Sequence, residues 1–469
     1  MSDFPNHVDI VLGVYFGLIT VFQGVLLVAS LWAVRRARGL RYVDTGAELL
    51  EPTRMPPVAL IVPCFNEAET IADSVRALTQ IDYPGLEILV VNDGSRDETI
   101  KVLKRAFKLR RAEIAGEGRL KHELVRDTFR SGLHPRLSVI DKVNGGKADA
   151  LNAGIEHTLC PLVCCIDADT IVDRQAITRL VEPFLTSDPP PQAVGGIIQI
   201  ANDSRFEEGL LQERQWPRNW LARNQALEYL RAFLFFRTPM ARWNANLIIS
   251  GALGLFRRSA VLEVGGYETA TVGEDMELVV RLHRQSLEKG QSYDIAFRSD
   301  AVAYTECPEK VGALVRQRDR WQRGLIQTLL IHRRLSFRRN SVMIGWFVIP
   351  FFWIFEVVGP FVELFATSWW AWGVIGQRIP VAFIVLMLVV ATSLNLLVSL
   401  HTLLLDDLDG RRASWRTSMG VLSTAFLEPL RYRPIVVWAR ILGTWKYIRG
   451  DGSWGSMKRR GFKTEGSST

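Results

Sequence analysis

The sequence predicts an α/β domain built on a doubly wound mixed sheet, combined with helices that cross a membrane. Between residues 56 and 332, short apolar runs alternate with helical patterns, and this alternation is typical of a doubly wound sheet. Long apolar segments lie toward both ends of the chain, at 10–34, 343–365 and 380–405. Each is long enough to span a bilayer as a helix.

The basic residues predict how these segments are oriented. They follow or precede the apolar segments at Arg35, Arg36, Arg38 and Arg41, at Arg333, Arg334, Arg338 and Arg339, and at Lys458, Arg459 and Arg460. Such clusters favour the cytoplasmic side of a membrane. We therefore expect a cell-membrane protein with an N-terminal transmembrane anchor (1–40), a cytoplasmic domain (41–335), transmembrane helices (336–408) and an interfacial or re-entrant segment with a cytoplasmic tail (409–469).

Composition excludes two classes of protein. The chain has 469 residues and a net charge of +8, but its basic residues gather beside apolar segments instead of forming an aromatic-rich nucleic-acid surface. Its 5 cysteines include two adjacent ones on an expected buried strand, and none shares metal-ligand spacing with a histidine. We expect no nucleic-acid partner and no disulfide framework.

Polar residues follow the predicted strands. Strands are expected at 58–62, 86–91 and 162–166, and helices at 68–80, 97–110 and from Met276 to Arg284. Active groups of doubly wound sheets gather at the carboxyl ends of strands. Asn66 and Glu67 follow the first of these strands, Asp93 the second, and Asp167 and Asp169 the third.

Asp167 and Asp169 are the candidate metal ligands. If the strand continues through them, residues two apart project to the same face. Two adjacent carboxylates repel unless a cation lies beside them, and hard oxygen ligands suit Mg²⁺ or Mn²⁺. Taken alone, the pair is more typical of a solvated turn or cap than of a metal site.

Three helical or apolar segments leave alternatives open. The pattern over 216–237 fits either a basic amphipathic helix in the membrane interface or an ordinary helix packed on the sheet. Glu356 and Glu363 share one helix face inside an expected span, where acids are either functional or paired with arginines. The 419–430 segment contains Glu428 and is too short for a span, so we expect it to be interfacial or re-entrant.

The order of motifs resembles a known family. They are Pro63-Cys64-Phe65-Asn66-Glu67, Val91-Asn92-Asp93-Gly94-Ser95, Gly145-Gly146-Lys147, Asp167-Ala168-Asp169, Gly273-Glu274-Asp275 and Gln317-Arg318-Asp319-Arg320-Trp321. Together they resemble the membrane-embedded family 2 (GT-A) glycosyltransferases, such as the poly-N-acetylglucosamine, hyaluronan and cellulose synthases. The resemblance covers about residues 55–335 and implies a GT-A nucleotide-sugar domain. Gly273 stands where many synthases have threonine, and Trp454-Gly455-Ser456-Met457 only partly matches a tail motif of hyaluronan synthases.

The resemblance implies a donor site for a UDP-sugar. Asp93 would read the uridine, with Asn66 and Glu67 nearby, and Lys147 would bind the diphosphate. Asp169 would contact the metal directly, and Asp167 would face the nucleotide side as well. The divalent ion would act as a Lewis acid that stabilises the departing nucleotide.

The resemblance also implies an acceptor site. Asp275, with Glu274 beside it, would be the general base at a helix start, where an anion is stabilised. Gln317 and Arg320 would act at the diphosphate side, and Trp321 would stack on a sugar ring. Ser250 and Gly251 are small enough to leave room for an acceptor.

The expected function is therefore an inverting, metal-dependent transfer from a UDP-sugar to a growing β-linked polysaccharide at the lipid bilayer. Three spans are few for a polymerising synthase, which implies an accessory or regulatory subunit or a homo-oligomer. One alternative is a non-processive enzyme that glycosylates a membrane lipid, giving a glycolipid. Another is an inactive receptor or export scaffold.

Overall fold

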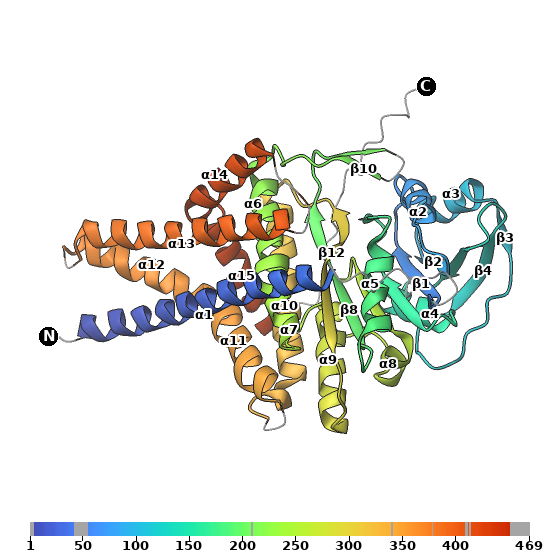
Figure 1. The fold of residues 1–469 in the computed structure, drawn as a ribbon, viewed down its shortest axis with the longest axis horizontal. Coiled ribbons are helices and arrows are strands. Elements are labelled where there is room, and N and C mark those ends of the chain that lie inside the picture. The colour runs from blue at the N-terminus through green and yellow to red at the C-terminus, as the bar shows by residue number, and fades with distance from the viewer. Residues whose placement is uncertain are drawn as a thin grey trace. The chain divides into compact units, whose positions relative to one another are not determined.

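The computed structural model describes residues 4–41, 55–207, 210–338, 341–377, 379–408, 411 and 414–450 (Figure 1). The chain forms two compact units, which are described separately. The sheet unit comprises the described residues of 55–218 and 244–307, and the helical unit those of 4–41, 219–243 and 308–450. Residues 219–243 and 308–335 thus belong to the helical unit, although the sequence led us to expect them in a 41–335 domain. The expected tail motifs, including Lys458, lie outside the described residues.

A ten-stranded mixed sheet organises the sheet unit. Its strands, in spatial order, are β3 (Leu109–Arg111), β4 (Val125–Ser131), β5 (Leu137–Lys142), β2 (Leu86–Asp93), β1 (Val58–Cys64), β6 (Leu162–Cys165), β11 (Gly254–Arg257), β8 (Ala193–Ile200), β12 (Ile295–Thr305) and β7 (Ile171–Val172). Strands β5, β2, β1 and β6 run parallel, as do β8 and β12, while β11 is antiparallel to both of its neighbours. A separate two-stranded sheet contains β9 (Arg205–Glu207) and β10 (Leu210–Glu213). The mixed sheet predicted from the sequence is confirmed.

Helices connect these strands. They are α2 (Ile71–Thr79), α3 (Thr99–Ala106), α4 (Lys147–Glu156), α5 (Ala176–Thr186), α8 (Arg258–Glu263) and α9 (Glu274–Lys289). Helix α4 lies close against β1 because Gly154 has no side chain: a Cβ there would lie 2.4 Å from Ile61. Strand β1 is almost wholly buried, as its apolar run predicts. The expected strands and helices all occur, with ends that differ by a few residues.

The helical unit contains the long apolar helices. Its elements are α1 (Phe4–Arg41), α6 (Trp220–Leu230), the π-helix η1 (Arg231–Arg237), α7 (Thr238–Arg242), α10 (Val311–Ile331), η2 (Arg333–Leu335), η3 (Val342–Val348), α11 (Ile349–Phe351), η4 (Phe352–Val357), α12 (Gly359–Ile375), α13 (Val381–Leu408), α14 (Trp415–Arg431) and α15 (Arg433–Ile448). Among the described residues, His7–Trp32 and Val381–Leu408 are long and apolar enough to cross a membrane. A third span requires that Val342–Val357 and Gly359–Ile375 act as one, although they are bent by 45°.

The bend has a local cause. Pro360 is the second residue of α12, and proline has no N–H to continue the hydrogen-bond ladder of the preceding helix. The expected 343–365 span is therefore not one straight helix, and the apolar stretch continues to Ile375.

The two acids of this bent segment are paired with arginines. Glu363 accepts a hydrogen bond from Arg433 Nε at 2.8 Å, and Glu356 accepts one from Arg440 at 2.7 Å. Both arginines lie on α15. The structural alternative that the sequence left open for Glu356 and Glu363 is the one observed.

Other helices also pack inside this unit. Leu227, Leu230 and Phe233 of the α6–η1 segment are buried, and the segment packs against α13 and α14. Arg231 pairs with Glu428 at 2.6 Å. Helix α14 is longer than the expected 419–430 segment and does not qualify as a span among the described helices.

Candidate active site

Two loops at the carboxyl edge of the sheet are joined by side-chain hydrogen bonds. The main-chain N–H of Asn66, after β1, donates to Ser95 Oγ at 3.0 Å, and Arg96 N–H donates to Asn66 Oδ1 at 2.8 Å. Glu67 N–H donates to Thr99 Oγ1 at 2.9 Å. These contacts bring the loops after β1 and β2 together, as parallel neighbouring strands require. Asn66 itself is exposed and has a left-handed backbone, with φ of 56°.

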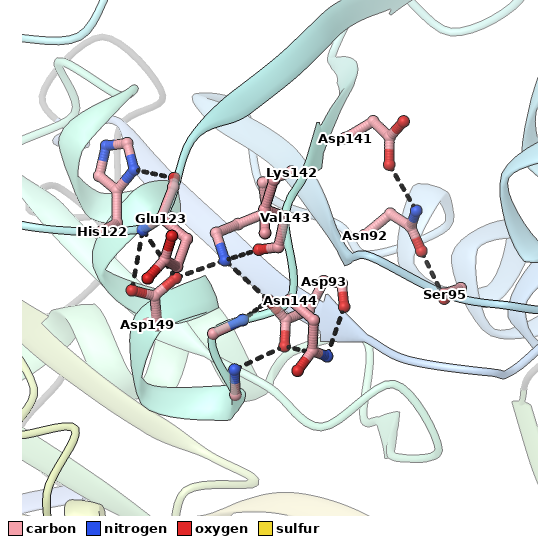
Figure 2. A network of polar contacts seen from close by, with 12 residues as sticks. Asn92, Asp93, Ser95, His122, Glu123, Asp141, Lys142, Val143, Asn144 and Asp149 are labelled. Carbon is pink, nitrogen blue, oxygen red and sulfur yellow. Dashed lines mark hydrogen bonds and ion pairs between the residues drawn. The ribbon is translucent and has the colours of Figure 1, made fainter.

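Asp93, at the end of β2, is surrounded by donors from the chain itself (Figure 2). Its Oδ1 accepts from Lys142 Nζ at 2.7 Å and from Gly145 N–H at 2.9 Å. Its Oδ2 accepts from Asn144 Nδ2 at 3.0 Å and from Gly146 N–H at 2.8 Å. The residue is only 3% exposed. Asp93 therefore holds the turn that leads into α4.

Lys147 is the first residue of α4 and lies among acids. Its Nζ is 2.5 Å from Asp167 Oδ1 and 3.8 Å from Glu274 Oε1. Burial alone disfavours the ammonium, but Asp167, Glu274 and Asp275 outweigh that effect and hold the pKa of Lys147 above its ordinary value. The predicted phosphate ligand is thus a permanent cation at neutral pH.

Asp167 and Asp169 lie in a turn after the strand, and not at the end of the strand itself as the sequence led us to expect. Strand β6 ends at Cys165, and Thr170 N–H donates to the Asp167 carbonyl at 3.0 Å, which closes a turn. Because the backbone turns here, the alternation of an extended strand does not place these two side chains. Asp167 is in contact with Lys147, and both acids remain partly exposed.

Asp275 lies in the first turn of α9, where a helix start was expected. Its Oδ2 accepts from Gly251 N–H at 3.3 Å, and its Oδ1 from its neighbour Met276 N–H at 2.9 Å. A Cβ at Gly251 would lie 3.1 Å from Lys147 Nζ, so a larger residue there would crowd the end of the lysine side chain. Glu274, the preceding residue, is buried. The structure thus brings Lys147, Asp167, Gly251, Glu274 and Asp275 together.

A divalent cation at Asp167 and Asp169 would need further oxygen ligands from a substrate. Among the described residues, no group of three or more His, Cys, Asp or Glu side chains is placed to hold a metal. Mg²⁺, however, is usually bound by one or two carboxylates together with substrate phosphates. Asp167 and Asp169, both partly exposed, match that requirement. Their role as metal ligands stays a prediction.

The Gln317–Trp321 motif lies on α10 of the helical unit. Residues three and four apart lie on the same face of a helix. Gln317, Arg320 and Trp321 therefore share one face of α10. Gln317, Arg320 and Trp321 are less buried, and Trp321 is 41% exposed. The intervening Arg318 is 3% exposed and pairs with Glu228 at 2.7 Å.

Sequence reasoning missed the residues that support this site. Lys142 is fully buried beside Asp93, and Asp149 of α4 is also buried. In the helical unit, and separately from these residues, Arg318 stacks on the Trp321 ring, with its guanidinium carbon 4.1 Å from the ring centre. A signal existed for Lys142: it ends an apolar strand whose register places it beside Asp93 on β2.

The fold is a mixed GT-A-like sheet together with long apolar helices that could span a membrane. The structure resembles that of mannosyltransferase PcManGT from Pyrobaculum calidifontis, solved in complex with GDP-Man and Mn²⁺, with a TM-score of 0.50. The match covers 95% of this chain and 99% of that chain at 17% sequence identity, and it shows the fold alone.

The sequence comparisons indicate a family. The model for glycosyl transferase family 2 matches residues 59–265. The poly-β-1,6-N-acetyl-D-glucosamine synthase of Staphylococcus epidermidis is 30% identical over 281 residues, which are 60% of this chain and 57% of that protein. The synthase of Staphylococcus aureus strain COL is 28% identical over 325 residues, 68% of each chain. Residues 59–265 are thus similar to glycosyl transferase family 2, and the chain is similar to these synthases over about 60–68% of its length.

Proposed function

We propose that this chain is an inverting transferase that moves a sugar from a UDP-sugar to a growing β-linked polysaccharide at the membrane. The observation that carries the proposal is the adjacency of Asp275 and Lys147. Asp275, the proposed proton acceptor, directly follows Glu274 in α9. Glu274 Oε1 lies 3.8 Å from Nζ of Lys147, the proposed diphosphate ligand. The names of the staphylococcal relatives favour N-acetylglucosamine as the sugar.

The reaction is a single displacement. An acceptor hydroxyl oxygen forms a bond to the sugar C1, and its proton passes to Asp275. The bond between C1 and the diphosphate oxygen breaks, and its electron pair leaves with the diphosphate. Lys147 stabilises that negative charge as it develops. A bound Mg²⁺ or Mn²⁺, held by Asp167 and Asp169, would add positive charge at the same diphosphate.

Gly251 supports this assignment in two ways. Its N–H holds one oxygen of Asp275, so the carboxylate keeps a fixed direction. Its missing side chain leaves the space that Lys147 Nζ approaches. Ser250 and Gly251 therefore shape the acceptor side of the same site. The family resemblance gives the remaining proposed roles: Asp93, Asn66 and Glu67 would act at the nucleotide, Gln317 and Arg320 at the diphosphate, and Trp321 at an acceptor sugar.

The membrane location is part of the proposal. Among the helices that the structure describes, two, or three with the bent pair, could cross a bilayer. The basic residues after the first of them, including Arg35 and Arg36, favour a cytoplasmic sheet unit, where nucleotide sugars are available. We expect a multi-pass protein of the cell membrane.

Product sizing tests the proposal. The full chain, purified in nanodiscs, is incubated with radiolabelled UDP-N-acetylglucosamine or UDP-glucose and Mn²⁺ or Mg²⁺. Wild type should give a product of many sugars, and Asp275→Asn should give at least about a hundredfold less product in the same time. The absence of any transfer or hydrolysis by wild type, with every donor and metal, would leave the inactive-scaffold alternative.

The lipid-glycosylating alternative rests on the small number of spans. The two or three candidate spans in the described part of the chain would offer few walls for a polysaccharide path. If a single-sugar glycolipid is the only product, this alternative replaces the polymer. If polymer forms only at high protein concentration or with a partner protein, the homo-oligomer or accessory subunit expected from the sequence is required.

A further inference from the structure

The acceptor positions of Asp93 are already used inside the protein. A carboxylate offers about four lone-pair positions. In the sheet unit, Lys142, Asn144, Gly145 and Gly146 donate to them, two to each oxygen. A uracil N–H could bind Asp93 only by displacing one of these donors. The contacts therefore indicate a role in holding the backbone that follows β5.

The Lys142 ammonium is equally well matched. Its side chain is fully buried and has three donors. They meet Asp93 Oδ1, a carboxylate oxygen of Asp149, and the Val143 carbonyl at 2.6 Å (Figure 2). Asp149 in turn accepts from Glu123 N–H at 3.0 Å. Removing one partner of a buried ion pair strongly destabilises the protein, because the other charge is left without compensation. Asp93, Lys142 and Asp149 therefore act as a unit.

The turn is also fitted sterically. Gly94 has φ of +64°, and a Cβ there would lie 2.7 Å from the Asn144 nitrogen. A Cβ on Gly145 would lie 2.5 Å from Asp149 Oδ1, an atom that Lys142 and Glu123 already hold. The backbone at Gly145 can therefore approach the ion pair only without a side chain. Lys147 is the next residue and begins α4.

We propose that Lys142 and Asp149 are positioning residues of the donor site. Through Asp93 and the Asn144–Gly146 turn, they fix the first residue of α4 so that Lys147 reaches the diphosphate. This inference rests on the diphosphate role proposed for Lys147. It implies that the buried network supports phosphate binding and does not select the nucleotide base.

Binding measurements on the full chain in nanodiscs separate these roles. The probes are UDP, CDP and inorganic pyrophosphate, measured by isothermal titration calorimetry with Mn²⁺ present. Lys142→Met should weaken the binding of all three probes by about tenfold or more. This is the loss expected when Lys147 no longer makes one charge-assisted hydrogen bond to the diphosphate or pyrophosphate. The ratio of UDP to CDP affinity should stay the same. Lys101→Met is the matched control, because it removes a lysine from an exposed ion pair of the same unit.

Gly145→Ala provides a second variant that keeps every charge. It should reproduce the loss of pyrophosphate affinity, even if Lys142→Met fails to fold. Loss of UDP binding with unchanged pyrophosphate binding in either variant would show that the network reads the base, and would overturn the inference. Unchanged binding of every probe, with only a lower Tm, would also overturn it.

The benchmark variant Lys147→Met keeps this test distinct from the proposed function. If Lys147→Met weakens pyrophosphate binding and neither supporting variant does, the positioning role alone is wrong. If Lys147→Met itself has no effect, the diphosphate role of Lys147 is wrong, and the inference falls with it.

Discussion

Glu363 and Arg433 form an ion pair between a bent, apolar helix and a helix that the sequence did not reveal. A second ion pair joins Glu356 to Arg440. Glu356 lies seven residues before Glu363, whereas Arg440 lies seven residues after Arg433. The spacing is that of two antiparallel helices whose facing sides repeat every two turns. These pairs fix α15 along η4 and α12.

Charge reversal tests this arrangement. Glu363→Arg and Arg433→Glu should each lower the Tm, because each leaves a charge opposed in the helical unit. The free energy of unfolding should decrease by on the order of 1–2 kcal/mol, as for interhelical polar contacts in membranes. The double reversal should restore most of it. Arg449→Gln, at the end of the same helix, is the control, and a double variant no more stable than the singles would contradict the pairing.

The general-base role of Asp275 predicts a loss of chemistry without a loss of binding. Asp275→Asn should lower kcat by about 10²–10⁴, the usual contribution of a positioned base. The Kd for UDP should change little, because Asp275 is placed on the acceptor side. Glu288→Gln, an exposed residue late in α9, is the control. A large change in UDP affinity with kcat preserved would argue against this role.

Removal of the metal should stop transfer. Chelation should abolish product formation, and Mn²⁺ or Mg²⁺ should restore it. Asp167→Asn and Asp169→Asn should each raise the metal concentration needed for half-maximal rate by about tenfold or more. Asp173→Asn, in the next loop, is the control. Full activity in excess chelator would exclude the metal-dependent mechanism.

Trp321 predicts an effect on product length. Because its ring is 41% exposed and Arg318 stacks on it, a sugar can contact the ring. Trp321→Ala should shorten the polymer and leave the KM for UDP-sugar within about twofold. Trp445→Ala, which removes an exposed tryptophan of α15, is the control. Products of unchanged length would remove Trp321 from the acceptor path.

The burial of His283 predicts that the protein becomes less stable as the pH falls. The ring is fully buried, and its Nε2 must carry the proton, because it donates to the Asn246 carbonyl at 2.9 Å. Burial lowers the pKa of His283 to about 4. Between that value and the ordinary 6.5, the unfolded chain binds more protons, so stability decreases as pH falls, by at most about 3 kcal/mol.

The measurement is the Tm at pH 7.5 and pH 5 for wild type and His283→Gln. The wild-type Tm should fall more between these pH values than that of the variant. His134→Gln, which changes another histidine of the same unit, should behave as wild type does. An identical acid shift in wild type and His283→Gln would contradict this prediction.

Much of the sheet unit could be predicted, because its signals are local. The apolar run of Val58–Val62 predicts a buried strand from composition alone, and β1 is one. The acids at the start of α9 likewise predict a helix N-terminus. The exception is Asp167–Asp169, where strand alternation was extended past the last strand residue. A turn hydrogen bond from Thr170 ended the strand earlier.

Residues paired across the chain could not be predicted in this way. Arg433, Arg440 and Lys446 interrupt the apolar pattern of 433–448, so no helix was predicted there. In the folded chain they meet Glu363, Glu356 and Asp319, respectively. Gly443 allows the close approach, because a Cβ there would lie 2.7 Å from the Asp319 carbonyl.

The sequence by itself predicted the similarity to a family, the mixed sheet, the long apolar helices and the candidate site residues, because each depends on a local pattern or a motif. Only the tertiary structure decided what neutralises the buried charges. It placed Lys142 between Asp93 and Asp149, and Lys147 against Asp167. These partners are distant in the chain, and their pairing depends on which strand ends and helix starts the fold brings together.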